Sequence, residues 1–293
     1  NQPAFKAMLK EQSRRVIDYI RGVDQDEVEV TVSGYTYTIP EFRSRKADWD
    51  GDLSLELDDG ETGEETCRLG DVVYSSPTVV GRPAENYHLL YRDESYAAFA
   101  KKYKNRRQVI YTGANDGMFH AFNGGFYNAS DKSFTTYYDV DGDNSHDAGE
   151  GIQFDLGAEM WAYVPYNLLP HLYWLTEEDY PHVAYCDLKP KIVDAKVFPA
   201  DTTHPGGWGT LLIGGMRLGG GEITADMDKT DSSTGGAGPN PDDRTMTSAY
   251  FILDITDPEQ PPDLIAELSF DGMGYTTCYP AVVPMKDRDS STG

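Results

Sequence analysis

The most specific chemical pattern in this 293-residue chain runs from Asp139 to Glu150. Within these twelve residues, oxygen-bearing side chains occupy positions one, three, five, seven, nine and twelve. This is the ligand order of an EF-hand calcium loop, in which a tightly turning backbone directs alternate oxygens at a hard cation. The spacing therefore predicts a Ca²⁺ site. Its candidate ligands are Asp139, Asp141, Asp143, Ser145 through its carbonyl, Asp147 directly or through water, and Glu150 with both oxygens.

One residue of this loop departs from the pattern. Position six, normally Gly, is Asn144. Asn is the next residue most able to adopt a left-handed conformation, so the turn stays feasible. The alternative interpretation is an acidic hairpin tip that is exposed to solvent. We favour calcium because random acidic runs rarely keep oxygen side chains at the odd positions.

The flanks of the loop have the composition of strands. Thr135–Tyr138 precedes it and Met160–Val164 follows it, and both are rich in aromatic and β-branched residues. A calcium loop between strands is not an EF-hand pair that opens a groove for signalling. We expect the ion to cancel repulsion between carboxylates and to order a long connection, a structural or conformational role.

Charge and composition narrow the class of protein. The chain has 25 basic and 49 acidic residues, and its net charge of −24 repels nucleic acid and anionic membranes alike. The 20 Tyr and 29 Gly residues are typical of strand-and-turn proteins. No apolar run approaches membrane-spanning length. Because the first residue is Asn1, we expect a longer precursor, with any signal peptide removed or upstream.

The three cysteines, Cys67, Cys186 and Cys278, have no zinc-binding spacing. A disulfide between Cys186 and Cys278 is possible in an oxidising compartment, and buried or free thiols are the favoured alternative.

Residues 1–66 are expected to form a first unit made of a helix, a hairpin and an acidic connection. The helix begins near Pro3 and ends at Gly22, with an apolar face and a polar face that carries Arg14 and Arg15. Residues 28–39 alternate on either side of a Ser-Gly pair, which predicts a hairpin. The residues from 48 to 65 are interpreted as an acidic loop exposed to solvent.

Residues 67–293 contain a repeated unit of four strands. In each complete unit, a strand that begins with or near Pro is followed by a hydrophobic strand ending in or near Gly, and then by two more strands. The expected strands are 75–80, 108–113, 118–122 and 159–164 in the first unit, 189–194, 208–215, 248–254 and 263–268 in the second, and 279–283 at the start of a third.

Repeated units of four antiparallel strands are typical of β-propeller blades. The predicted fold class is therefore all-β: an incomplete β-propeller of two full four-stranded blades plus the start of a third. It has an N-terminal helix and long acidic insertions at about 126–158 and 222–247. Two blades cannot close a ring, so we expect the sequence to be part of a longer chain.

Several segments, in the same order, resemble the PilY-type tip proteins of bacterial type IV pili. The most specific is Val109–Asn123, which reads VIYTGANDGMFHAFN. The other matching segments are 68–77, 93–96, 161–165, 212–216 and 249–258, and the resemblance extends from about residue 16 to residue 284.

This resemblance implies a modified C-terminal β-propeller in a secreted or cell-surface protein, exported through the periplasm and placed at the pilus tip. It also implies roles in pilus assembly, adhesion and the balance of extension and retraction. The implied partners are minor pilins of the tip complex and a host or abiotic surface. Family members carry calcium in the propeller, in a nine-residue loop of a later blade. The Asp139–Glu150 loop lies in an insertion of the first unit and is a separate prediction.

An enzymatic function is the main alternative, since quinoprotein dehydrogenases share the propeller fold class. Their quinone site needs a closed ring, a catalytic carboxylate and stacking aromatic residues. Asp116 is interpreted as a turn residue and His120 as a packed or hydrogen-bonded strand residue. His171, His182 and His204 are scattered in expected loops. The favoured hypothesis is a calcium-binding adhesin or assembly protein that is not an enzyme; a purely structural filament subunit is the third possibility.

Overall fold

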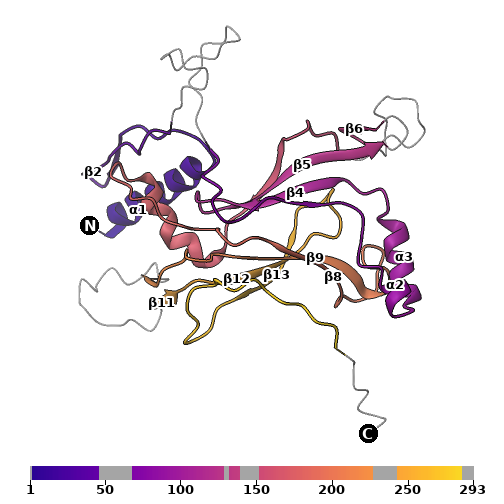
Figure 1. Ribbon diagram of the computed structural model, residues 1–293. Helices are drawn as coiled ribbons and strands as arrows, with labels where there is room; N and C mark the ends of the chain where they lie inside the picture. Colours follow the sequence, from indigo (N-terminus) through magenta and orange to yellow (C-terminus); the bar gives the residue numbers. More distant parts are fainter. Residues whose placement is uncertain (1, 46–67, 129–131, 139–151, 227–242, 286–293) are drawn as a thin grey trace.

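The chain is described by a computed structural model that covers residues 2–45, 68–128, 132–138, 152–226 and 243–285. Its body consists of two antiparallel sheets that lie face to face, with helices at both ends (Figure 1). The boundary expected at residues 66 and 67 falls outside the described residues, and so do Cys67 and the connection from 48 to 65. No helix in the described ranges is long and apolar enough to cross a membrane.

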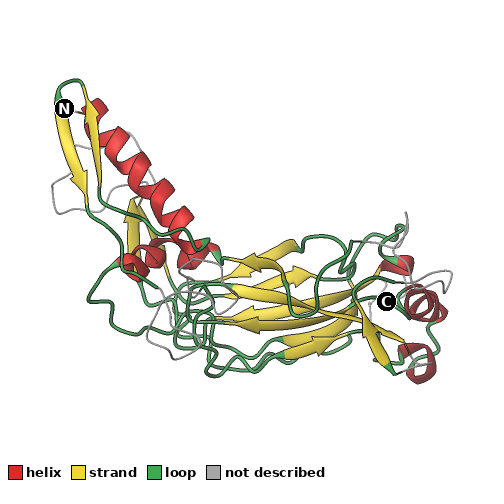
Figure 2. Cartoon of the chain, turned by 90° about the horizontal axis from the view of Figure 1, so that it is seen from above, coloured by secondary structure: helices red, strands yellow, loops and turns green. Residues whose placement is uncertain are grey.

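The N-terminal unit is a helix packed beside a two-stranded hairpin, and it extends away from the sheets (Figure 2). Helix α1 (Gln2–Ile20) ends where Gly22 takes a φ of +94°, as expected. Strands β1 (Val28–Val32) and β2 (Tyr35–Ile39) pair antiparallel, joined by a Ser-Gly turn in which both residues have positive φ. The predicted helix and hairpin are confirmed.

One residue of this unit was placed wrongly by sequence reasoning. Arg15, expected on the polar face of α1, is only 2% exposed. Its guanidinium donates to the carbonyls of Ile39, at 3.3 Å, and Pro40, at 3.2 Å, and lies 4.7 Å from the ring centre of Phe42. An arginine can be buried on a helix when backbone carbonyls satisfy its donors, and here the returning hairpin supplies them.

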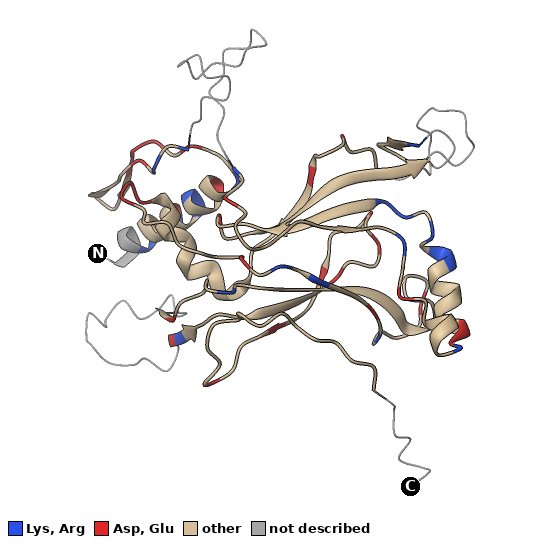
Figure 3. Ribbon diagram, viewed as in Figure 1, with Lys and Arg blue, Asp and Glu red and all other residues tan. Residues whose placement is uncertain are grey.

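Helices also cover the opposite end of the sheets, where the sequence had predicted none. They are α2 (Tyr87–Leu90), α3 (Glu94–Lys102) and the 3₁₀ turn η2 (Pro205–Gly207). Asp93 caps α3, accepting hydrogen bonds from the backbone N–H groups of Ser95 and Tyr96. Lysines in the last turn complement the helix dipole, and basic residues continue toward the following strand (Figure 3).

The first sheet is the first predicted blade. Its strand order is β3-β4-β5-β7, and a short strand β6 pairs with the end of β5. The bounds are β3 (Thr78–Val80), β4 (Gln108–Gly113), β5 (Phe119–Asn128), β6 (Ser133–Thr135) and β7 (Glu159–Tyr163). An 11-residue 3₁₀ helix, η1 (Tyr166–Thr176), follows β7 and lies against α1.

The second sheet is the second predicted blade, with the strand order β8-β9-β12-β13. Its strands are β8 (Lys191–Lys196), β9 (Trp208–Gly215), β12 (Tyr250–Asp254) and β13 (Asp263–Leu268). Gly214 of β9 is required by packing, because a Cβ atom there would lie 2.2 Å from the ring of Phe251.

Two expectations for the second half of the chain need correction. Residues 279–283 form no strand, because a strand needs a hydrogen-bonded neighbour and no later described strand supplies one. The segment at 222–247, expected to be a long acidic insertion without strands, has paired ends. Strands β10 (Ile223–Asp226) and β11 (Asp243–Met246) form a two-stranded antiparallel sheet there.

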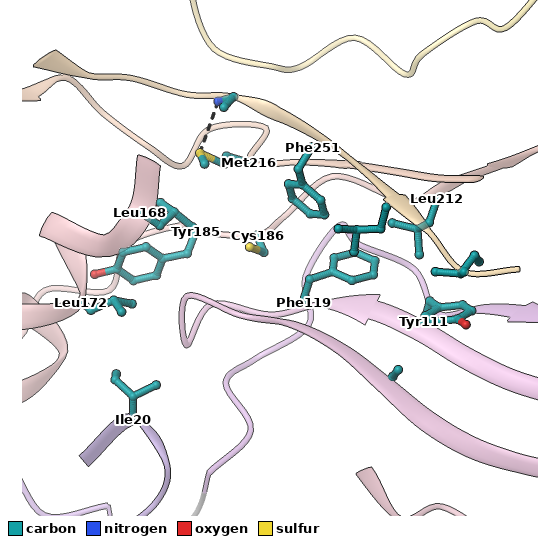
Figure 4. Packing of buried hydrophobic residues seen from close by; sticks show 14 of the residues in the cluster. Ile20, Tyr111, Phe119, Leu168, Leu172, Tyr185, Cys186, Leu212, Met216 and Phe251 are labelled. Carbon is teal, nitrogen blue, oxygen red and sulfur yellow. Dashed lines mark hydrogen bonds between the residues drawn. The ribbon is translucent and has the colours of Figure 1, made fainter. Parts of the chain in front are cut away.

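The main hydrophobic core lies between the two blades. Phe119 of the first blade meets Phe251 of the second edge to face, with ring centres 5.4 Å apart (Figure 4). Both rings are fully buried, as is Leu212 of β9. The alternating inward residues of β4, β5, β9 and β12 thus form one continuous core, which also takes in residues of α1 and η1. The blades are therefore held as one body.

Candidate functional site

The predicted calcium ligands, Asp139, Asp141, Asp143, Ser145, Asp147 and Glu150, all lie outside the described residues. The structure does describe where their segment leaves and rejoins the first blade. The segment follows β6 and precedes β7, and both of these strands pair with β5. The flanking elements are thus strands and not helices, as predicted, although 136–138 do not continue β6.

A single guanidinium holds both sides of this insertion at its base. Arg107, 1% exposed, donates to the carbonyl of Thr136 on one side, at 3.2 Å, and to the carbonyl of Ile152 on the other. The guanidinium lies against the rings of Phe126, at 4.6 Å, and Phe154, at 5.4 Å. The two ends of the acidic insertion are therefore fixed relative to each other by one buried side chain.

The same guanidinium forms an ion pair with the second blade. Glu259, in the connection between β12 and β13, accepts from Arg107 Nε at 2.7 Å and Nη2 at 3.0 Å, and also from the backbone N–H of Ile152 at 3.3 Å. A bidentate guanidinium–carboxylate pair is both strong and directional. We call Arg107 and Glu259 the interblade clamp, because they join the base of the insertion to the other blade.

Further polar contacts cross the interface between the blades. Arg106 donates to Thr210 Oγ1 at 2.9 Å and to the carbonyl of Thr256 at 3.0 Å. Asp194 accepts from Thr210 of its own blade at 2.7 Å and, across the interface, from the Tyr96 hydroxyl of α3 at 2.6 Å. Burial, reinforced by the neighbouring Asp194 carboxylate, raises the pKa of Tyr96. These buried groups are satisfied across the interface, which fixes the relative position of the blades.

Glu267 on β13 makes a third connection. Its carboxylate accepts from the backbone N–H groups of Tyr166 and Asn167, both at 2.8 Å, and from the Tyr163 hydroxyl at 3.1 Å. These donors stand at the end of β7 and the start of η1, so the second blade caps a helix that follows the first. Burial, together with Glu267, raises the pKa of Tyr163.

His120 on β5 is held by two carboxylates. Its Nδ1 lies 2.5 Å from Glu159 Oε1 on β7, and its Nε2 lies 3.0 Å from Asp116 Oδ2 in the β4–β5 turn. Burial disfavours the imidazolium, but the hydrogen bonds and charges of the two carboxylates outweigh it and raise the pKa of His120 to about 9. The ring is therefore protonated at neutral pH, and both of its nitrogens are engaged.

Asp116 has the turn role expected from the sequence and a second role besides. Its carboxylate accepts from the backbone N–H of Met118, at 2.9 Å, and of Gly70, at 2.8 Å, which fixes the turn to the segment before β3. His120 and Glu159 also line a hollow of about 610 Å³ between the first blade, α1 and η1, whose other walls are mainly apolar. A protonated histidine with both nitrogens bonded is not placed to act as a general base.

The other histidines and cysteines are dispersed. His182 pairs with Asp71 at 2.9 Å and His204 with Asp254 at 2.8 Å, while His171 is buried in η1 and not in the loop expected. Cys186 is buried, Cys278 is exposed, and both are free thiols, so the possible disulfide between them is not formed. In the described part of the chain, no three His, Cys, Asp or Glu side chains are grouped to hold a metal ion.

Sequence reasoning missed the interblade clamp and the Glu267 cap. One signal in the sequence was the Arg-Arg pair immediately before the hydrophobic strand β4. Two adjacent cations next to a buried strand need hydrogen-bond acceptors, so the pair indicates that acidic or carbonyl partners lie nearby. The identity of those acceptors had no local signal, because Glu259 lies 152 residues away from Arg107.

Comparison with known proteins gives a family match and several relatives. Residues 69–164 match the family model of the PilY1 beta-propeller domain, and this range includes the strands of the first blade. The chain is 29% identical over 225 residues to a type IV pilus biogenesis factor PilY1 homolog of Xylella fastidiosa. It is 31% identical over 187 residues to the type IV pilus biogenesis factor PilY1 of Pseudomonas aeruginosa strain PAK.

The matched regions are a small part of these relatives. The alignments cover 75% and 62% of this chain, but only 13% of the Xylella protein and 13% of the Pseudomonas protein. A crystal structure of the Pseudomonas aeruginosa PilY1 C-terminal domain is similar over 69% of this chain and 28% of that chain, with 23% identity and a TM-score of 0.35.

Proposed function

Because this chain is a PilY-type protein, we propose that it acts in the biogenesis of type IV pili as a binding component and not as a catalyst. The observation that carries the proposal is the match of residues 69–164 to the PilY1 beta-propeller domain, together with relatives that are themselves described as type IV pilus biogenesis factors. The ordered motifs that carry the resemblance, foremost Val109–Asn123, lie in and around the two blades.

The packing of the described residues supports a binding role. The two blades share one core and are joined by the interblade clamp and the Glu267 cap, so they form a rigid platform from which long insertions emerge. Functional loops carried on a rigid scaffold are the usual arrangement in binding proteins. His120, the most perturbed histidine of the described residues, is committed to two carboxylates, which favours a structural role over proton transfer.

We also propose that the segment Asp139–Glu150 binds Ca²⁺ through Asp139, Asp141, Asp143, Ser145, Asp147 and Glu150. The donor set suits this ion, because these residues offer only oxygen ligands and a carboxylate stands last, where bidentate binding closes the loop. When bound, the ion would neutralise the clustered carboxylates. Arg107 contributes to the same site from outside, since it holds residues on both sides of the segment at a fixed separation.

The location and partners follow from the same proposal. The protein would act at the cell surface, at the pilus tip, after export through the periplasm. Its partners would be minor pilins of the tip complex, and a host or abiotic surface in adhesion. Calcium in the insertion would influence adhesion and the control of retraction by fixing the shape of the surface that the insertion presents.

Calorimetric titration with Ca²⁺ tests the metal site. The wild-type chain is compared with the double variant Asp141→Ala, Asp143→Ala. The matched control is Asp228→Ala, Asp231→Ala, which removes the same charge from the other acidic insertion. We expect saturable binding in the wild type and in the control, and no saturable binding in the loop variant. Equal heats in all three proteins would reduce the loop to an acidic hairpin.

Piliation of the producing bacterium tests the biogenesis role. Deletion of the gene is expected to reduce the number of surface pili, and the full-length gene is expected to restore it. A strain that carries the loop variant should still assemble pili and should differ in adhesion or retraction when calcium is varied. Normal piliation in the deletion strain would contradict the biogenesis role, whatever the calorimetry shows.

A further inference from the structure

The strongest feature outside the sites above is a basic groove at the end of the molecule that carries α3. The basic groove consists of two adjoining hollows of about 710 Å³ and 310 Å³, which share Arg82 and Lys104 in their walls. It runs between the end of α3, the residues after β3 and the corner formed by β5 and β6. In Figure 3 the ribbon has the colour of Lys and Arg at the end of α3 and along the segment that leads into β4.

The charge of this groove is opposite to that of the chain. The whole chain carries −24, yet among the residues that the structure describes no Asp or Glu lines either hollow. Arg82 and Lys104 line both hollows, and Arg106 lines the larger one. Arg106 is engaged with Gly81, Thr210 and Thr256, so it contributes charge but few free donors. A concave surface of one sign concentrates ligands of the opposite sign.

Arg82 and Lys104 are available for a ligand. Both side chains are exposed, and neither makes a hydrogen bond or ion pair with any described residue. The walls beside them supply uncharged hydrogen-bonding groups and rings: the Gln108 amide, the Asn105 amide, which donates to the Tyr138 hydroxyl at 2.8 Å, and the Tyr127 ring, 52% exposed. Two unpaired cations flanked by amides and tyrosines suit a chain that carries carboxylates along an extended backbone.

We propose that the basic groove binds an extended acidic peptide segment of a partner protein. Carboxylates of the peptide would pair with Arg82 and Lys104, and its backbone would meet the amides of Asn105 and Gln108. Charge complementarity sets the choice of ligand, because a neutral or basic peptide would leave both cations unpaired in the groove. This inference does not depend on the calcium loop, and its failure would leave the proposed function unchanged.

The test is fluorescence anisotropy with a labelled oligoglutamate peptide and the complete chain. The groove variant is Arg82→Gln, Lys104→Gln. The matched control is Lys101→Gln, Lys189→Gln, which removes the same net charge from exposed lysines that do not line the groove. All four side chains are on the surface, so both variants should fold, and circular dichroism checks this.

We expect the groove variant to bind oligoglutamate about tenfold more weakly than the wild type, as the loss of two partly exposed ion pairs implies. The control variant should stay within about twofold, added salt should weaken binding, and oligoglutamine should not bind. Equal losses in the two variants, or no binding of oligoglutamate at all, would overturn the proposal. Tighter competition by polygalacturonate, or self-association that only the groove variant abolishes, would overturn it in favour of an anionic polysaccharide or a second copy of the chain.

Discussion

Replacing Glu259 by Gln removes the carboxylate of the interblade clamp and keeps its shape. The Arg107 side chain is 0% exposed and that of Glu259 is 24% exposed. Breaking a fully buried ion pair from one side costs about 3–5 kcal/mol. Because water reaches a quarter of Glu259, and because Arg107 keeps acceptors at Asn123, Thr136 and Ile152, we expect a smaller loss of about 2–3 kcal/mol in the free energy of unfolding.

Urea denaturation followed by tryptophan fluorescence measures this loss, since Trp161 lies in the first blade and Trp208 in the second. The corresponding fall in Tm is about 5 °C or more for a chain of this size. The control is Glu11→Gln, which breaks a surface pair with Arg14, whose side chain is 61% exposed, and should cost less than about 0.5 kcal/mol.

A double-mutant cycle with Arg107→Met isolates the pair. Removing the cation as well should restore part of the stability lost by Glu259→Gln, because the uncompensated buried charge is then gone. If Glu259→Gln costs no more than Glu11→Gln, the three remaining acceptors of Arg107 suffice, and the clamp does not hold the blades together.

Three further predictions concern single positions. The pKa of His120, about 9, lies above the value of about 6.5 for an unfolded chain. Its stabilisation, about 3 kcal/mol, is therefore complete below pH 6.5 and is lost as pH rises through 9. His120→Gln should flatten this part of a curve of unfolding free energy against pH, and an unchanged slope would contradict the assignment. Gly214→Ala should lower the free energy of unfolding, measured by urea titration, by about 2–3 kcal/mol, because the added Cβ would overlap the Phe251 ring. The control Gly221→Ala, whose Cβ would have its nearest atom at 3.8 Å, should lower it by less than about 1 kcal/mol. Similar losses in the two variants would refute the packing argument. Asp93→Ala should lower the free energy of unfolding by about 1 kcal/mol, because the N-cap of α3 is lost, and Asp93→Asn should retain most of that stability. Equal losses in the two variants would show that loss of the cap does not cause the destabilisation.

The strands of both blades could be predicted because their signals are local. Strands β4, β9 and β13 occur with the predicted bounds, since each is a hydrophobic or alternating run bounded by turn residues or charges. Helix α3 also has a local signal in the sequence, an Asp cap before it and two lysines at its end. The 3₁₀ helix η1 contains Pro170 and gives no regular periodicity to recognise.

The candidate site was less predictable, since its contacts are set by packing. The burial of Arg15 depends on carbonyls that the hairpin brings back 24 and 25 residues later. His120 was expected to be a packed or hydrogen-bonded strand residue, and it is both buried and hydrogen bonded, but its partner Glu159 comes from the far side of an insertion. Oxygen spacing along the chain could indicate a calcium loop, because all its candidate ligands lie within one segment of twelve residues. The interblade clamp instead joins residues that are distant in sequence.

The contacts of Arg107 also allow the insertion to be replaced by another segment. The carbonyls of Thr136 and Ile152 accept from one guanidinium, so the points where the chain leaves and re-enters the blade are held at a fixed separation. This separation does not depend on the sequence of the segment between them. Lengthening such a closed loop twofold adds only about 0.6 kcal/mol of closure entropy. A fluorescent peptide or an epitope could therefore be grafted between these two residues while the blades stay folded.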